Sequence, residues 1–228
     1  MPNKPRKILL LGGTKEAAER AAELVAQGAD VTTSLAGRTR EPEPVAGKVR
    51  VGGFGGVEGL ADYLLQNAIN ELIDATHPFA IQISANAKAA AERTGVTLTV
   101  LTRAPWQRET GDNWHILPSP EAAVDSPPPG ATVLLALGSQ HIAPFARRKD
   151  VHFIIRMIDR PQAPLPFAKH TIVLGKPSSE PDKEASLLKA YGVTHIVCRN
   201  SGGPGAYGKI VAARTLGLPV IMIERPTP

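Results

Sequence analysis

A single cysteine, Cys198, stands in a chain of 228 residues, so an internal disulfide is excluded and a structural zinc site is disfavoured. We expect Cys198 to be a buried strand residue. No apolar run approaches the length of a membrane span. Aromatic residues make up only 4% of the chain, which leaves few rings to stack on nucleic-acid bases. These shortages point away from disulfide-rich, membrane-spanning and nucleic-acid-binding proteins.

The charge balance is basic, with 26 Lys and Arg against 21 Asp and Glu and a net charge of +5. The cations are spread singly along the chain instead of gathering in runs, which again disfavours nucleic acid as a partner. A compact anionic small molecule suits this pattern better. The N-terminus passes from a basic tip directly into an apolar run without a signal-peptide cleavage site, so we expect a cytoplasmic protein.

Short apolar runs alternate with alanine-rich stretches of helical period. KILLLGG at 7–13 predicts a strand buried on both faces, and 14–28 predicts a helix that begins after Thr14 and ends at Gly28. Such alternation is typical of a parallel sheet with helices on both faces. Further strands are expected at 30–37, 48–54, 71–78, 96–103, 131–138, 151–159, 171–176, 194–200 and 219–224, with helices between many of them.

The stretch from Arg103 to Gly130 interrupts the alternation, because it holds six prolines and both tryptophans. We expect an N-terminal Rossmann-like lobe over 1–104, a proline-rich connector with a hairpin-like strand pair over 105–130, and a second α/β lobe over 131–228. The predicted fold class is therefore α/β, with two Rossmann-like lobes, mainly parallel sheets and a cleft between the lobes. Ligands of such sheets bind beyond the carboxyl ends of the strands.

The first predicted strand ends in LLGGT, where dinucleotide-binding folds hold a pyrophosphate. Gly12 and Gly13 permit a close approach of backbone amides to a phosphate, and Thr14 opens a helix whose positive end faces the anion. Lys15 adds a cation. An ordinary tight turn would have the same letters, but the position favours cofactor binding by these four residues.

A second glycine loop, GGPGAYGK at 202–209, also matches the spacing of a dinucleotide fingerprint. Pro204, however, has no amide proton to donate, and Lys209 stands at the start of the following helix. We interpret this loop as a wall that faces an anion, and whether it contacts cofactor, substrate or both stays open.

An NAD-preferring fold places Asp or Glu near the end of its second strand, about 20 residues past the glycines, to hold the ribose 2′-hydroxyl. This chain has TTSLAGRTR there instead. The hydroxyls of Ser34 and Thr39 and the guanidinium of Arg38 suit a 2′-phosphate, so NADPH is expected as the cofactor in preference to NADH. The alternative is that Arg38 and Arg40 are solvated loop charges.

Two further groups of polar residues follow predicted strands. In DATHPFA at 74–80, Thr76 and His77 would line a nicotinamide, and His77 would donate a proton, although a lone histidine is more often structural. In the second lobe, strand ends carry a donor-rich set whose members could each equally be solvated loop residues. That set is His141, Lys176, Arg199, Asn200, Ser201, Gly202, Gly203, Tyr207 and Lys209.

Seven segments together resemble one enzyme family. They are LLGGTKEA, TSLAGRT, VRVGGFGGVEGLADYL, IDATHPFAIQISANA, TRAPW, FIIRMIDRP and CRNSGGPGAYGKIVAARTLGLPVIMIERP. Spread over nearly the whole chain, they are similar to the precorrin-6A reductases of aerobic cobalamin biosynthesis. The resemblance implies a two-lobed Rossmann-like enzyme that uses NADPH, with no metal or flavin, to reduce one double bond of the tetrapyrrole-derived macrocycle of precorrin-6A and give precorrin-6B.

Carried over by position, the resemblance puts the cofactor phosphates at Gly12, Gly13 and Thr14 and the 2′-phosphate near Ser34 and Arg38. The acetate and propionate groups of the substrate would then bind the donor-rich set of the second lobe. Other cations expected near strand ends are Arg103, Arg108, Arg156 and Arg160.

The reduced carbon pair also needs a proton, from water or from a protein acid, for which His77 and Tyr207 are the candidates. Two other functions fit the same residues: NADPH-dependent reduction of another anionic, conjugated small molecule, or a non-enzymatic role in sensing NADPH. The donor-rich second lobe argues against a sensor, which would not require it.

The Arg38→Ala substitution is expected to raise the Michaelis constant for NADPH much more than that for NADH. The difference should be equivalent to about 1.5 to 3 kcal/mol, the usual worth of a hydrogen bond to a charged group. Steady-state kinetics with both cofactors measure it. Equal effects on the two cofactors would assign Arg38 to the fold or to phosphate binding in general.

Overall fold

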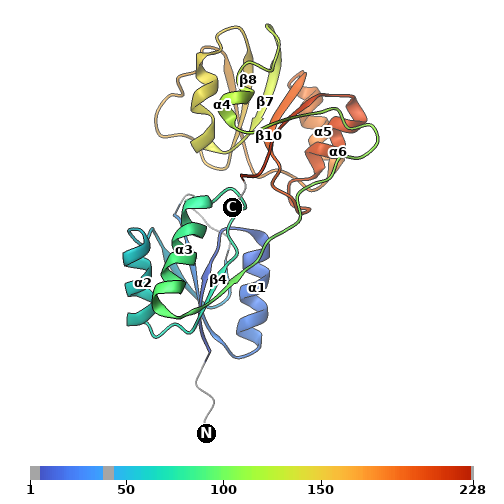
Figure 1. Ribbon diagram of the computed structural model, residues 1–228. Coiled ribbons are helices and arrows are strands. Elements are labelled where there is room, and N and C mark those ends of the chain that lie inside the picture. Colours follow the sequence, from blue (N-terminus) through green and yellow to red (C-terminus); the bar gives the residue numbers. More distant parts are fainter. Residues whose placement is uncertain (1–5, 38–43, 227–228) are drawn as a thin grey trace. The chain divides into compact units, whose positions relative to one another are not determined.

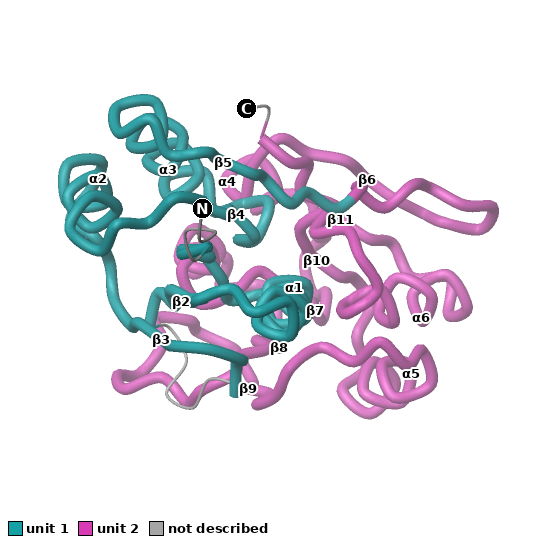
Figure 2. The backbone as a smooth tube through the Cα atoms, turned by 90° about the horizontal axis from the view of Figure 1, so that it is seen from below, with its two compact units in different colours: residues 1–103, 228 teal, residues 104–227 magenta. Residues whose placement is uncertain are grey.

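The computed structural model describes residues 6–37 and 44–226, and it divides into two compact units that meet in sequence between Arg103 and Ala104 (Figure 2). Each unit is a Rossmann-like α/β layer structure, which confirms the predicted α/β class with two mainly parallel sheets. Every strand pairing among the described residues is parallel. In the described ranges, no helix has both the length and the apolar character needed to cross a membrane.

The first unit has a five-stranded sheet in the order β3-β2-β1-β4-β5. Its elements are β1 (Lys7–Leu11), α1 (Lys15–Ala26), β2 (Asp30–Leu35), β3 (Lys48–Val51), α2 (Val57–Gln66), β4 (Glu71–Asp74), α3 (Ile81–Thr94) and β5 (Thr97–Val100). From β1 the chain adds β2 and β3 on one side, and it then crosses back to add β4 and β5 on the other side of β1. The carboxyl ends of β1 and β4 therefore form the topological switch point, where open sheets of this kind bind ligands.

Strand β1 lies at the centre of this unit, and both of its faces are buried. Leu9 and Leu11 pack against α2 and α3, whereas Ile8 and Leu10 pack against α1. Figure 1 shows α1 on the opposite side of the sheet from α2 and α3. A continuous apolar run such as KILLL suits this position because it has no solvent-facing side.

The second unit has a six-stranded sheet in the order β6-β11-β10-β7-β8-β9. Its elements are β6 (Trp114–Leu117), α4 (Pro120–Ala123), β7 (Thr132–Ala136), the 3-10 turns η1 (Ser139–His141) and η2 (Ala143–Arg147), β8 (His152–Met157), β9 (His170–Leu174), α5 (Pro181–Ala190), β10 (His195–Arg199), α6 (Gly208–Leu216) and β11 (Val220–Ile223). Here the chain turns back between β7 and β10, so the loops after these two strands flank the second switch point.

Aromatic rings fill one side of the second sheet. Phe145, Phe153 and Phe167 meet edge to face, with successive ring centroids 6.0 and 5.3 Å apart. The other side packs against α5 and α6, and both tryptophans, Trp106 and Trp114, belong to that cluster.

The hairpin-like strand pair expected within 105–130 is wrong. All of these residues are described, and they contain one strand, β6, which pairs in parallel with β11 through Trp114 and Val220. The segment thus belongs to the second unit. Because β6 is an edge strand, Pro118 and Pro120 can follow it without removing a hydrogen bond from the sheet.

Candidate functional site

The turn between β1 and α1 leaves open space before the helix. Thr14 caps α1, because its Oγ1 accepts a hydrogen bond from the Ala17 N–H at 3.1 Å and donates one to the Ala75 carbonyl at 2.8 Å. Gly13 has a φ of 104°, a conformation that side chains rarely adopt, and a Cβ there would meet nothing within 4 Å. The helix dipole and the free amides of a first helical turn favour an anion at such a place.

Gly12 brings this turn into close contact with β2. Its N–H donates to the Ser34 carbonyl at 2.9 Å, and a Cβ at this position would lie only 2.8 Å from Cγ2 of Thr33. Thr33 is buried, and its hydroxyl has no hydrogen-bond partner among the described residues. Glycine is therefore the residue that fits at position 12 without displacing the Thr33 side chain.

An ion pair balances the charge beside the turn. Nη1 of Arg103 lies 2.8 Å from each carboxylate oxygen of Glu16, in the first turn of α1. Burial raises the pKa of Glu16, but hydrogen bonds and the charge of Arg103 outweigh it, so the pKa lies below its usual value. Lys15, in contrast, is largely exposed, and its Nζ lies 3.5 Å from Oε1 of Glu19. Arg103 thus neutralises an acid that would repel a phosphate.

Ser34 marks the carboxyl end of β2 and is buried. The other two residues predicted at a 2′-phosphate, Arg38 and Thr39, lie outside the described residues. Arg50 of β3, which the sequence analysis did not select, lies beside Ser34, with 3.4 Å between its Nη1 and Oγ of Ser34. The signal missed was the pairing register, which sets Arg50 opposite Ser34.

A buried carboxylate shapes the loop after β4. Asp74 accepts hydrogen bonds from the N–H and the hydroxyl of Thr76, at 3.0 and 2.7 Å. Nδ1 of His77 accepts from the Phe79 N–H at 3.2 Å, so in the neutral ring Nε2 carries the proton. Since Thr14 donates to the carbonyl just before Thr76, this loop and the glycine turn are joined at the switch point.

In the second unit, the loop after β10 is fastened to the start of the unit. Asn200 accepts from the Trp106 N–H at 2.7 Å and donates to the Trp106 carbonyl at 3.0 Å, while the indole N–H of Trp106 donates to the Gly203 carbonyl at 2.7 Å. A Cβ on Gly202 would stand 2.2 Å from the Ala104 carbonyl oxygen. Gly202 therefore permits contact between two protein segments, unlike the open turn at Gly13.

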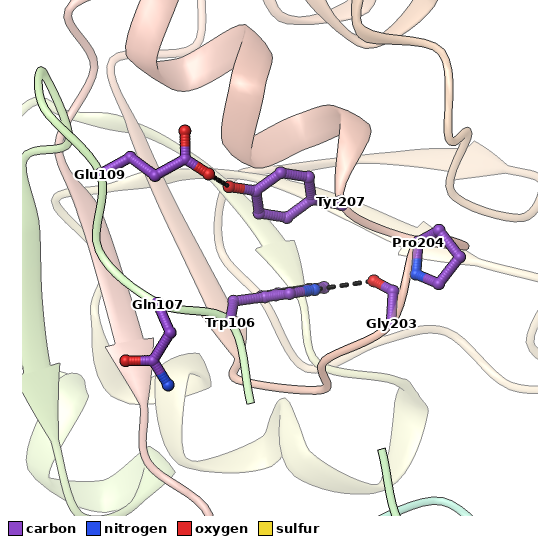
Figure 3. Close-up of a pocket in the computed structure, with 6 residues that line it drawn as sticks. All are labelled: Trp106, Gln107, Glu109, Gly203, Pro204 and Tyr207. Atoms are coloured by element: carbon purple, nitrogen blue, oxygen red, sulfur yellow. Dashed lines mark hydrogen bonds between the residues drawn. The ribbon is translucent and has the colours of Figure 1, made fainter. Parts of the chain in front are cut away.

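A pocket of about 310 Å³ lies beside this loop, and Figure 3 shows its residues. They are Trp106, Gln107, Glu109, Gly203, Pro204 and Tyr207. The Tyr207 hydroxyl donates to Glu109 at 2.7 Å and accepts from Arg214 at 3.0 Å. Burial, together with the hydrogen bond to Glu109, raises the pKa of Tyr207, so its proton is firmly held.

Two of the expected cations are buried within the second unit. Lys209 is 3% exposed, donates to the Ala206 carbonyl at 2.6 Å and lies 4.9 Å from the centroid of the Trp106 ring. Burial lowers its pKa. Arg156 forms a buried ion pair with Glu184 of α5, at 3.0 and 2.9 Å from its two oxygens. Arg156 lies near the end of β8, as expected, but its guanidinium is used to join β8 to α5.

The remaining predicted residues are only partly brought together. His141 is the last residue of η1, which follows β7, and Arg199 is the last residue of the neighbouring strand β10. A Cβ added at Gly138, just before η1, would lie 3.8 Å from Nη2 of Arg199. Ser201 follows in the same loop. Lys176 comes after β9, three strands away from β10, or about 14 Å at the usual strand spacing. His141, Arg199 and the 200–203 loop gather at the switch point, whereas Lys176 lies at the sheet edge.

Cys198 lies in the core of the second unit, where burial raises its thiol pKa and Sγ is 3.7 Å from the sulfur of Met222. Across residues 6–37 and 44–226, no three His, Cys, Asp or Glu side chains gather in a way that could hold a metal ion.

Comparison with known proteins shows extensive similarity. A family model described as "Precorrin-6x reductase CbiJ/CobK" matches residues 7–228. A precorrin-6A reductase of Rhodobacter capsulatus is 45% identical over 221 residues, which cover 96% of this chain and 88% of that protein. One of Rhodococcus erythropolis is 40% identical over 222 residues, with 96% and 89% covered. A solved structure described as "CobK precorrin-6A reductase" has a TM-score of 0.94 at 44% identity and covers 97% of this chain and 88% of its own.

The Gly12→Ala substitution is expected to lower the free energy of unfolding by about 1 to 3 kcal/mol, because its Cβ would overlap the packed Thr33 side chain. Urea and thermal unfolding measure the loss. The matched control is the same substitution in a Thr33→Ser background, which lacks the obstructing Cγ2 and should recover most of the loss. Equal losses in both backgrounds would show that Thr33 is not the obstacle.

Proposed function

Because the chain belongs to the precorrin-6x reductase family, we propose that it reduces precorrin-6A to precorrin-6B with NADPH, and that the NADPH binds to the first unit. The reaction adds a hydride to one carbon of a macrocyclic C=C bond and a proton to its neighbour. The bound nicotinamide supplies the hydride. The tasks left to the protein are to hold both molecules in register and to deliver or admit a proton.

The open glycine turn at the first switch point carries this proposal. Gly13 leaves space before α1, and the helix end offers amide donors and a positive dipole to a pyrophosphate. The one acid in the first turn of α1, Glu16, is already paired with Arg103. These features fit a dinucleotide, which residues 12–15 would hold.

The end of β2 supports the choice of NADPH. The one acid within β2, Asp30, stands at its amino end and is paired with Lys48 at 2.8 Å. No carboxylate of this strand would therefore repel a 2′-phosphate at Ser34. Together with Arg38 and Thr39, Ser34 forms the proposed 2′-phosphate site.

The carboxylates of the substrate are proposed to bind the strand-end loops of the second unit. Arg199 ends β10 and His141 ends η1 after β7, so both follow the two strands of its switch point, and the 201–203 backbone adds polar groups. Lys176 would reach a carboxylate at the sheet edge. Asn200 contributes indirectly, because both ends of its amide are bound to Trp106 and hold the loop in place.

Of the two proton-donor candidates, the place in the fold favours His77. Its loop adjoins the glycine turn through the hydrogen bond from Thr14 to the Ala75 carbonyl. Tyr207 already donates its proton to Glu109 and has a raised pKa, which makes it the poorer acid. We therefore assign Thr76 and His77 to the nicotinamide end and Tyr207, with Lys209, to the wall of the second unit.

Mixing the protein with NADPH and purified precorrin-6A should cause a loss of nicotinamide absorbance together with a change in the macrocycle spectrum. The same mixture with NADH is the control and should react more slowly. Oxidation of NADPH without a change in the macrocycle would indicate a different acceptor. Binding of NADPH without oxidation would indicate a sensor.

His77→Phe is expected to slow single-turnover hydride transfer by about 10²-fold or more, as loss of a general acid does, and to remove the pH dependence of that step. Tyr207→Phe is the matched control, because it also replaces a polar ring by a phenyl ring. It should keep most of the rate. An unchanged rate in the His77 variant across pH would eliminate His77 as the acid.

A further inference from the structure

Arg50 is a half-buried cation that has no carboxylate partner among the described residues. Nη1 donates to the Gly52 carbonyl at 2.5 Å, and Nη2 donates to the Gly53 carbonyl at 2.7 Å. Its guanidinium carbon lies 3.8 Å from the centroid of the Phe54 ring and 5.3 Å from that of Tyr63. Carbonyls and rings orient the guanidinium, but they do not neutralise its charge.

The guanidinium is held at the carboxyl end of β2, the ligand-binding edge of the sheet. The 3.4 Å between Nη1 and Oγ of Ser34 exceeds the usual length of an N–H···O hydrogen bond, so this donor is only weakly used. A phosphate oxygen beside Ser34 would accept a shorter and stronger hydrogen bond from Nη1 of Arg50. The carbonyl of the same Ser34 accepts a hydrogen bond from the Gly12 N–H. Ser34 therefore lies between Arg50, on its hydroxyl side, and the glycine turn, on its carbonyl side.

The glycine-rich segment 52–56 serves this arrangement. It directs two consecutive carbonyls, of Gly52 and Gly53, toward Arg50 and sets the Phe54 ring under the guanidinium. Phe54 is itself supported edge to face by Tyr63 of α2, at a centroid distance of 5.3 Å. A side chain whose rotamer is set in advance loses little conformational entropy when it binds a ligand.

We propose, resting on the NADPH binding assigned above, that Arg50 is a specificity-determining residue that binds the 2′-phosphate together with Ser34. A ribose with a bare 2′-hydroxyl offers no charge to this guanidinium. Arg50 therefore strengthens binding of NADPH and leaves binding of NADH nearly unaffected.

Isothermal titration of the Arg50→Gln variant with NADPH and with NADH tests the proposal. The dissociation constant for NADPH should rise about ten- to hundredfold, the effect of losing a charged hydrogen bond, while that for NADH changes less than about twofold. The matched control is Lys48→Gln, on the same strand and with the same loss of charge, but paired with Asp30 at the amino end. It should leave the ratio of the two constants unchanged.

The ratio is the decisive quantity, because a partly unfolded preparation changes the binding capacity for both nucleotides alike. Equal weakening of NADPH and NADH would assign Arg50 to the fold alone and overturn the proposal, as would no weakening at all. Ser34→Ala should shift the ratio in the same direction by a smaller factor. If the unaltered chain binds NADH as well as NADPH, the 2′-phosphate site itself is absent, whereas failure to bind either nucleotide rejects the proposed function as a whole.

Discussion

Parallel pairing of β1 with β2 on one side and β4 on the other determines how the first unit presents its polar groups. Because all three strands run in one direction, the glycine turn, Ser34 and the loop after Asp74 come to one edge. Hydrogen bonds from Gly12 to Ser34 and from Thr14 to Ala75 help to hold that edge together. The absence of a side chain at position 12 is what lets the turn approach β2 so closely.

In the second unit, much of the positive charge is used internally. Arg156 is buried against Glu184, and Arg214 binds both Glu109 and Asp112. Lys209 is buried next to a tryptophan ring. The net charge of +5 is therefore a poor guide to how many cations a polycarboxylate ligand would find at the strand ends. Several Lys and Arg residues instead hold α5, α6 and the 105–112 segment.

The sequence predicted those features that depend on neighbouring residues. KILLL and the Thr14 cap are local, and the family resemblance covered nearly the whole chain, so the α/β class and the glycine turn could be predicted. Features that depend on distant pairing could not. β6 is stabilised by β11, which follows about a hundred residues later, and Arg50 gains its significance only from the β2–β3 register. In the same way, the contact of Tyr207 with Glu109 cannot be read from either residue.

The chain contains two tryptophans, and their surroundings differ. Both indoles are buried, but Trp106 lines the pocket of the second unit, close to the Lys209 ammonium and 5.6 Å from the Tyr207 ring, whereas Trp114 lies on β6. Indole fluorescence responds to nearby charge and polarity. Trp106 is thus an intrinsic optical reporter of events in that pocket, which Trp114 does not line.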